Sequence, residues 1–246
     1  MKKIFVFDFD GVICDSSYEC LISSWNAWQI FNKKVNFRYE ILSFEQLYIN
    51  NFLKLRPYVR GAGEFFLVHK LIELDVEVNS QNEYDLLVLE NKQFIDDFKK
   101  LVYDEREKLR SNQEKKWIDL HFMYKEVVEI MMSIPSENLF IATLKDAKSV
   151  SILLASVNIN IENSRILDQS MIKSKLDALD QISMISNRKK DEIVLIDDNI
   201  NHLIPPKTFG YNVFLTTWGN VLPEFSAIAD SYGIEKVFLE NLKVIL

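Results

Sequence analysis

The chain of 246 residues is long enough for one large domain or two small ones, and its 48% hydrophobic content can supply a packed core. Its 29 basic and 36 acidic residues give a formal net charge of −7, which disfavours non-specific binding to nucleic acids and anionic lipids, because these attract cationic surfaces. The six glycines and five prolines are too few for a collagen-like or disordered chain.

The cysteines and the N-terminal segment predict the compartment. Cys14 and Cys20 are the two cysteines; they could form one disulfide, but two reduced thiols in a cytoplasmic protein are the simpler interpretation. The apolar run that starts at Ile4 is interrupted at Asp8, which is too early for a signal peptide. No stretch approaches the ~20 apolar residues of a membrane span. We therefore expect a cytoplasmic protein without a membrane partner.

In chain order, the first predicted element is a short buried strand over residues 3–9. The following segment, 17–134, is rich in Glu, Lys, Leu and Phe and nearly free of strand signals, which favours helices. Further apolar runs predict strands over 139–142, 193–196 and 212–215, and helical spacing predicts helices over 147–156 and 173–186. This alternation is typical of an α/β fold with a doubly wound parallel sheet.

The same pattern predicts two domains. We expect residues 1–16 and 135–246 to form the α/β core, with 17–134 inserted between the first two strands as an all-helical domain.

Polar residues follow the predicted strands where ligands bind in parallel sheets, at the carboxyl ends. Asp8 and Asp10 follow the first strand and, two residues apart on extended backbone, point the same way, while Gly11 permits a sharp exit. The later strands are followed by Thr143 and Lys145, and by Asp197 and Asp198. A single Asp after a strand is usually a helix cap or turn residue, but two acidic groups at strand ends favour a site.

Such a group of carboxylates also predicts a metal. At ~4 Å and an effective dielectric of ~20, each pair of like charges costs about 4 kcal/mol, which a divalent cation would offset. Oxygen ligands suit Mg²⁺ rather than zinc, and Mg²⁺ sites with few protein carboxylates leave room for a substrate phosphate.

These residues resemble the motifs of one family. The segment 8–16, DFDGVICDS, resembles the first motif of the haloacid dehalogenase superfamily, DxDG[VT]xxDS. Residues 139–143 resemble the second motif, a strand that ends in Thr or Ser, and 193–198 resemble the fourth, a strand that ends in acid. Lys175 resembles the lysine of the third motif, and Lys173 is an alternative for that position.

The resemblance implies a role for each residue. Asp8 would be the nucleophile and Asp10 the general acid and base. Thr143 would bind a phosphoryl oxygen, and Lys175 would neutralise charge on Asp8 and the phosphoryl group. The Asp8 carboxylate, the Asp10 main-chain carbonyl and Asp198 would hold Mg²⁺.

The resemblance also implies that the helical insert acts as a cap that selects the substrate. Gly11 and Lys145 are candidate substrate-binding residues in the core, and Arg60 is the candidate in the insert. Arg60 could equally be a surface or salt-bridged arginine. Trp25 and Trp28 are expected to pack the insert rather than to bind a ring.

Two positions depart from the fourth motif, which often reads Gly-Asp-x-x-x-Asp. Asp197 stands at the Gly position and His202 at the position of the last Asp. Asp198 remains the expected ligand, with Asp197 supporting it, and His202 either replaces an outer contact or is an ordinary helix residue. Because dehalogenating members lack the acid at the position of Asp10, phosphoryl transfer is favoured over halide displacement.

The sequence therefore predicts a Mg²⁺-dependent phosphatase that acts on a small phosphorylated metabolite through an aspartyl-phosphate on Asp8. A phosphomutase of the β-phosphoglucomutase type, a phosphonate hydrolase and a non-catalytic binding protein of the same fold are the alternatives. The protein is expected to be a monomer or a homodimer.

Overall fold

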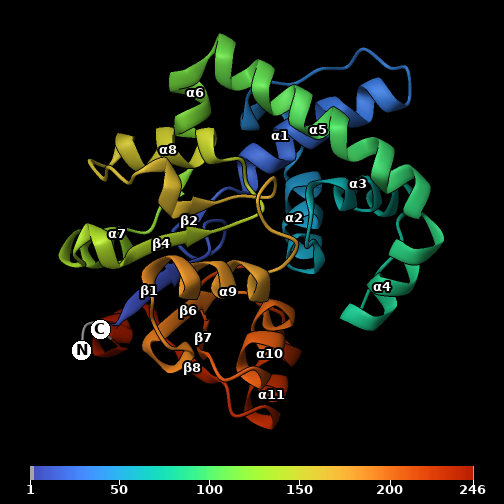
Figure 1. Ribbon diagram of the computed structural model, residues 1–246. Coiled ribbons are helices and arrows are strands. Elements are labelled where there is room, and N and C mark those ends of the chain that lie inside the picture. The colour runs from blue at the N-terminus through green and yellow to red at the C-terminus, as the bar shows by residue number, and fades with distance from the viewer. Residues whose placement is uncertain (1–2, 246) are drawn as a thin grey trace. The chain divides into compact units, whose positions relative to one another are not determined.

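The computed structural model describes residues 3–245 and divides the chain into two compact units (Figure 1). Met1–Asp15 and Phe122–Leu246 form one unit, called the sheet unit here, and Ser16–His121 form the other, called the helical insert. No helix among the described residues is long and apolar enough to cross a membrane.

The sheet unit is built on a six-stranded parallel sheet with the order β5-β4-β1-β6-β7-β8. The strands are β1 (Ile4–Phe7), β4 (Leu139–Ala142), β5 (Ile166–Leu167), β6 (Ile193–Asp197), β7 (Asn212–Thr216) and β8 (Glu235–Val237). In Figure 1 the blue strand β1 lies among strands from the second half of the chain. The continuous apolar runs of β1, β4 and β6 are buried along their whole length, as the centre of a parallel sheet requires.

Helices connect these strands, and a short antiparallel pair joins β2 (Cys14–Asp15) to β3 (Phe122–Met123). The helices of the sheet unit are α7 (Lys125–Ser133), α8 (Ala147–Ser156), α9 (Lys175–Ser186), α10 (Ile200–Thr208) and α11 (Pro223–Ser231). The short 3-10 helices are η4 (Ser136–Asn138), η5 (Asn163–Arg165), η6 (Lys190–Glu192) and η7 (Leu239–Ile245). The predicted α/β fold with a parallel sheet is thus confirmed.

The direction of winding changes beside β1. From β1 the chain moves to β4 and β5 on one side, and then continues with β6, β7 and β8 on the other. This reversal places the carboxyl ends of β1 and β6 next to each other, where α/β sheets bind their ligands.

The elements of the helical insert are all helices. The α-helices are α1 (Ser17–Phe31), α2 (Gln46–Leu55), α3 (Phe65–Leu74), α4 (Gln81–Glu90), α5 (Lys92–Asn112) and α6 (Glu114–Asp119). The 3-10 helices are η1 (Ile41–Ser43), η2 (Arg56–Tyr58) and η3 (Ala62–Glu64).

The insert ends earlier than the sequence suggested. Its first boundary lies within one residue of the predicted one, but residues 122–134 group with the sheet unit rather than with 17–134. The reason is main-chain pairing, since Cys14 is paired with Met123 and the Tyr124 N–H donates to the Ile13 carbonyl at 3.0 Å. This segment is therefore part of the sheet unit.

Aromatic side chains fill the interior of the insert. Trp25 and Trp28 are both buried, and Trp28 packs edge-to-face on Phe66 and Phe98. The Trp28 Nε1–H donates to Glu73 at 2.8 Å, so the polar atom of the buried indole is satisfied. Both tryptophans pack the insert, as expected.

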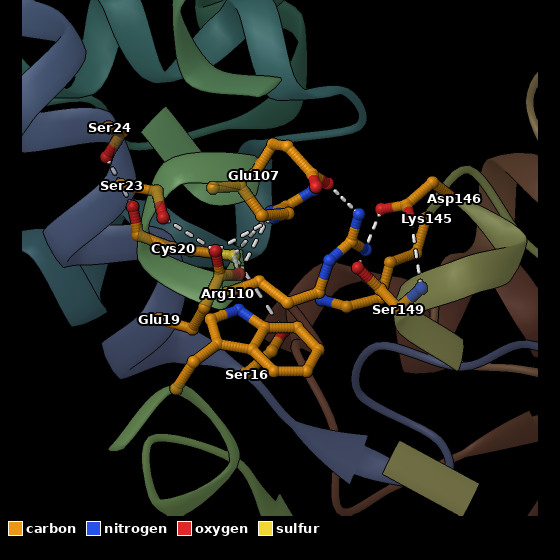
Figure 2. A network of polar contacts seen from close by, with 12 residues as sticks. Ser16, Glu19, Cys20, Ser23, Ser24, Glu107, Arg110, Lys145, Asp146 and Ser149 are labelled. Carbon is orange, nitrogen blue, oxygen red and sulfur yellow. Dashed lines mark hydrogen bonds and ion pairs between the residues drawn. The ribbon is translucent and has the colours of Figure 1, made fainter. Parts of the chain in front are cut away.

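A buried ion pair joins α1 to α5. The Arg106 guanidinium donates from two nitrogens to Glu19, at 2.8 and 3.0 Å, and Ser23 donates to the same carboxylate at 2.7 Å. Glu19 and Ser23 belong to the polar network in Figure 2. Because both charged side chains are almost completely buried, removal of one partner would leave the charge of the other in the interior without its counter-charge and destabilise the insert.

The insert also buries a histidine. His69 is fully buried on α3, with Nδ1 at 2.7 Å from the Tyr48 hydroxyl and Nε2 at 2.8 Å from the Ser24 hydroxyl. Burial lowers the pKa of His69 to about 3, so the ring stays neutral in the folded protein.

This histidine is expected to make the protein sensitive to acid. In the unfolded chain the ring takes up a proton near pH 6.5, whereas the folded protein resists this until about pH 3. Stability from this group is therefore complete above pH 6.5 and falls as the pH decreases below it, by about 2 kcal/mol at pH 5.

Urea unfolding at pH 7.5 and pH 5 measures this loss. His69→Gln, which has no titrating ring, should lose about 2 kcal/mol less than the wild type between these pH values. An equal loss of unfolding free energy in the wild type and in His69→Gln would contradict the assignment of this acid sensitivity to His69.

Candidate active site

The candidate site lies where β1 and β6 end side by side. Phe7 of β1 is in register with Ile196 of β6, and the Asp8 N–H donates to the Ile196 carbonyl at 2.9 Å. Asp8 directly follows β1, and Asp197 is the last residue of β6. The two acidic groups of the sequence thus meet at one edge of the sheet.

Lys175 lies between the two carboxylates. Its ammonium Nζ is 2.8 Å from Asp8 Oδ1 and 3.0 Å from Asp197 Oδ2, and it donates to the Ala142 carbonyl. All three charged side chains are almost completely buried, with exposed fractions of 3% for Lys175, 11% for Asp8 and 0% for Asp197. One buried cation therefore compensates two buried anions.

The structure distinguishes the two candidate lysines. Lys175 is the first residue of α9, because Ser174 caps this helix by accepting the Asp177 N–H at 3.1 Å. Lys173 lies before the cap and is exposed to solvent. Of these two lysines, Lys175 is the one that contacts Asp8 and Asp197.

The buried cluster shifts the pKa values of its members. Burial, reinforced by the charge of Asp197, raises the pKa of Asp8 in spite of the nearby Lys175. Burial opposes ionisation of Asp197 as well, but Lys175 and His202 together lower its pKa below the ordinary value. Burial acts to lower the pKa of Lys175, yet Asp197 and Asp8 outweigh it and raise that pKa. The two carboxylates therefore stabilise the ammonium form of Lys175.

The two oxygens of Asp8 differ in their surroundings. Oδ1 accepts the Phe9 N–H at 2.7 Å and faces Lys175. Within residues 3–245, Oδ2 accepts no hydrogen bond. The carboxylate is thus fixed through one oxygen, and the other is available to a ligand.

Asp10 and Thr143 are linked through Lys145. The Lys145 ammonium is 3.1 Å from Asp10 Oδ1, and the Lys145 N–H donates to the Thr143 hydroxyl oxygen at 3.1 Å. The Lys145 side chain is fully buried, whereas 21% of the Asp10 side chain is exposed. A role for Lys145 in substrate binding remains a prediction, and its ammonium is paired with Asp10.

Glycines make room for Asp198. Gly11 has a φ of +84°, and a Cβ there would clash with the Asp198 carboxylate. A Cβ at Gly219 would clash with the Gly11 carbonyl oxygen and with Asp198. The Asn220 N–H donates to Asp198 Oδ2 at 2.7 Å. Gly11 thus shapes the site through its backbone, and the loop after β7 holds Asp198.

Asp8, Asp10 and Asp198 offer oxygen atoms, which are the ligands that a divalent cation such as Mg²⁺ prefers, and their assignment as its ligands stays a prediction. A second group, Asp8 with Asp197 and His202, has ligand atoms within 4.8 Å of one another. The ammonium of Lys175 already contacts both of these carboxylates, so this second group is suited to the lysine rather than to a metal.

The positive charge of Arg60 is compensated by acidic side chains of the insert. Its guanidinium pairs with Asp85 and lies 3.8 Å from Glu64, which is the salt-bridged alternative that the sequence left open. His202 contacts the site, because its Nδ1 is 3.2 Å from Asp197 Oδ1.

Sequence reasoning missed two features of this site, the Asp10–Lys145 pair and the contact of Asn220. The Trp218–Gly219 pair after β7 was the available signal for the second.

No protein-family model matches the chain, and no curated protein matches it. Solved structures do. A predicted phosphoglycolate phosphatase from Haemophilus somnus 129PT is 15% identical, with a TM-score of 0.64 over 99% of this chain and 97% of that chain. A haloacid dehalogenase-like hydrolase from Streptococcus pneumoniae is 14% identical, with a TM-score of 0.62 over 99% and 97%.

A HAD family hydrolase from Deinococcus radiodurans R1, with bound phosphate and sodium, is 12% identical, with a TM-score of 0.56 over 99% of this chain and 94% of that chain. At such identities the likeness is one of fold. The chain has the fold of the haloacid dehalogenase-like hydrolases.

Proposed function

We propose that this protein is a Mg²⁺-dependent phosphatase that hydrolyses a small phosphomonoester through an aspartyl-phosphate on Asp8. One observation carries the proposal: Lys175 and the Phe9 N–H hold one oxygen of a buried aspartate, and its other oxygen accepts no hydrogen bond from residues 3–245. An oriented carboxylate beside a fixed cation is what nucleophilic attack on a phosphoryl group requires.

In the first step, Asp8 Oδ2 attacks phosphorus and the bond between phosphorus and the ester oxygen breaks. Asp10 donates its proton to the departing oxygen, so the alcohol leaves neutral. In the second step, Asp10 takes a proton from a water molecule, which attacks the phosphorus of the acyl phosphate. The bond from phosphorus to Asp8 breaks, and inorganic phosphate leaves.

Two further residues would stabilise the charge that the phosphoryl group carries. Lys175 is the nearest cation to Asp8 and stays protonated. The Thr143 oxygen accepts the Lys145 N–H, which leaves its hydroxyl hydrogen for a phosphoryl oxygen. Fixed donors of this kind account for most of the rate enhancement in phosphoryl transfer.

The Asp8 carboxylate, the Asp10 main-chain carbonyl and Asp198 would hold Mg²⁺. When bound, the ion supplies positive charge that neutralises and orients the phosphoryl oxygens. Phosphate bound to a hydrolase of the same fold supports a phosphorylated substrate.

The test is phosphate release from p-nitrophenyl phosphate and from a panel of small sugar and carboxylic acid phosphates, with Mg²⁺ or with EDTA. We expect release that requires Mg²⁺, and a melting temperature that Mg²⁺ raises, because a ligand that binds only the folded state stabilises it. A protein that Mg²⁺ stabilises but that hydrolyses none of these esters would contradict the phosphatase assignment.

A further inference from the structure

His202 is hydrogen-bonded to Asp197, whose carboxylate shares the Lys175 ammonium with Asp8. The ring lies on α10, and its Nδ1 is 3.2 Å from Asp197 Oδ1. Since a carboxylate oxygen can only accept, Nδ1 carries the hydrogen of this bond.

The first turn of α10 thus fixes the orientation of Asp197. Besides the imidazole, Asp197 Oδ1 accepts the Asn199 N–H at 2.9 Å. Two donors on Oδ1 leave Oδ2 directed at Lys175, which it meets at 3.0 Å. Asp197 is fully buried, so no solvent competes for this orientation.

The position of the lysine in turn depends on Asp197. The Lys175 ammonium has three oxygen neighbours, since it donates to the Ala142 carbonyl and forms ion pairs with Asp8 and Asp197. If Asp197 turned away, one of the three contacts that fix Nζ would be lost, and the cation could move from Asp8 Oδ1.

We propose that His202 is a positioning residue, which holds Lys175 against Asp8 by fixing the carboxylate of Asp197. The contact itself stands on the distances above, and its consequence for turnover rests on the proposed phosphatase activity.

The surroundings of His202 allow this to be tested without loss of the fold. About 22% of the side chain is exposed, and the ring borders a cavity of about 220 Å³ that Lys175 also lines. A side chain of different shape can be accommodated there more easily than in a close-packed interior.

Three variants separate positioning from packing. His202→Leu keeps an apolar body of similar size but removes the donor, and we expect kcat to fall by about 10–100-fold while KM changes by less than about 2-fold. His202→Asn places an amide N–H near the position of Nδ1 and should recover most of kcat. Asn201→Ala, at an exposed neighbouring position on α10, is the control and should keep both constants.

A second measurement does not depend on activity. In EDTA, His202→Leu should lower the melting temperature by about 2–4 °C in the wild-type background, and by less than about 1 °C when Asp197→Ala has already removed the acceptor. The same melting-temperature shift in both backgrounds would contradict a stabilising contact between His202 and Asp197.

The two assays distinguish failure of this inference from failure of the proposed function. An active wild type whose kcat is unchanged by His202→Leu, or is lowered equally by His202→Leu and His202→Asn, would overturn the positioning role. The wild type could instead be inactive while His202→Leu shifts the melting temperature less in the Asp197→Ala background. This result would support the contact between His202 and Asp197 and contradict the proposed phosphatase activity.

Discussion

Asp8→Asn is expected to lower phosphate release by about 10⁴-fold or more, because an amide oxygen cannot form the covalent intermediate. The loss should appear in kcat with every ester that the wild type hydrolyses. Steady-state kinetics with purified protein measures it.

The melting temperature of the variant shows whether activity is lost through the chemistry or through unfolding. Burial raises the pKa of Asp8, so the charged carboxylate is disfavoured at its site, and a neutral amide of the same shape should not lower the melting temperature in EDTA. Asp191→Asn, at an exposed position before β6, is the matched control and should retain full activity. Substantial turnover by Asp8→Asn would mean that another group attacks phosphorus.

Lys175→Met should damage both turnover and stability. Removal of the Lys175 ammonium leaves Asp8 and Asp197 buried without their shared cation. The loss of one partner from a buried ion pair typically costs about 3–5 kcal/mol of stability. The turnover of any protein that remains folded should fall by about 10³-fold, in line with the loss of one fixed donor from the site.

The destabilisation should diminish as the pH falls, because protonation removes the uncompensated charge. The pKa of Asp8 is already raised in the folded protein, so the folded state gains stability from proton uptake at this group as the pH falls toward that pKa. Urea unfolding at pH 7.5 and pH 5.5 measures the difference.

Lys173→Met is the matched control for this variant, since it removes the exposed lysine two residues earlier. It should change neither stability nor kcat. If Lys173→Met lost activity and Lys175→Met did not, the alternative that the sequence left open would be the right one.

The sequence was most informative where a residue's environment follows from its neighbours along the chain. Long apolar runs predicted β1, β4, β6 and β7, and their carboxyl ends predicted that Asp8 and Asp197 would meet. The strands β5 and β8 were not predicted, because two residues and three residues are too few to show a period.

The site details that were not predicted depend on contacts between distant segments. Lys145 pairs with Asp10 across 135 positions in the chain, and Asn220 holds Asp198 through a main-chain N–H that any residue other than proline would offer. The choice between Lys173 and Lys175 depended on Ser174, whose capping bond sets where α9 starts. The end of the insert depended on pairing of Met123 with Cys14 in strands of two residues each.

The covalent intermediate is the central claim, and rapid acid quenching tests it most directly. Wild-type protein is mixed with Mg²⁺ and a phosphomonoester labelled in its phosphoryl group, quenched within milliseconds, digested and analysed by mass spectrometry. We expect a transient phosphoryl group on the peptide that contains Asp8, at a level that falls once the substrate is exhausted and that is absent from Asp8→Asn. Turnover without a labelled peptide at any time, or a label on another residue, would contradict the mechanism.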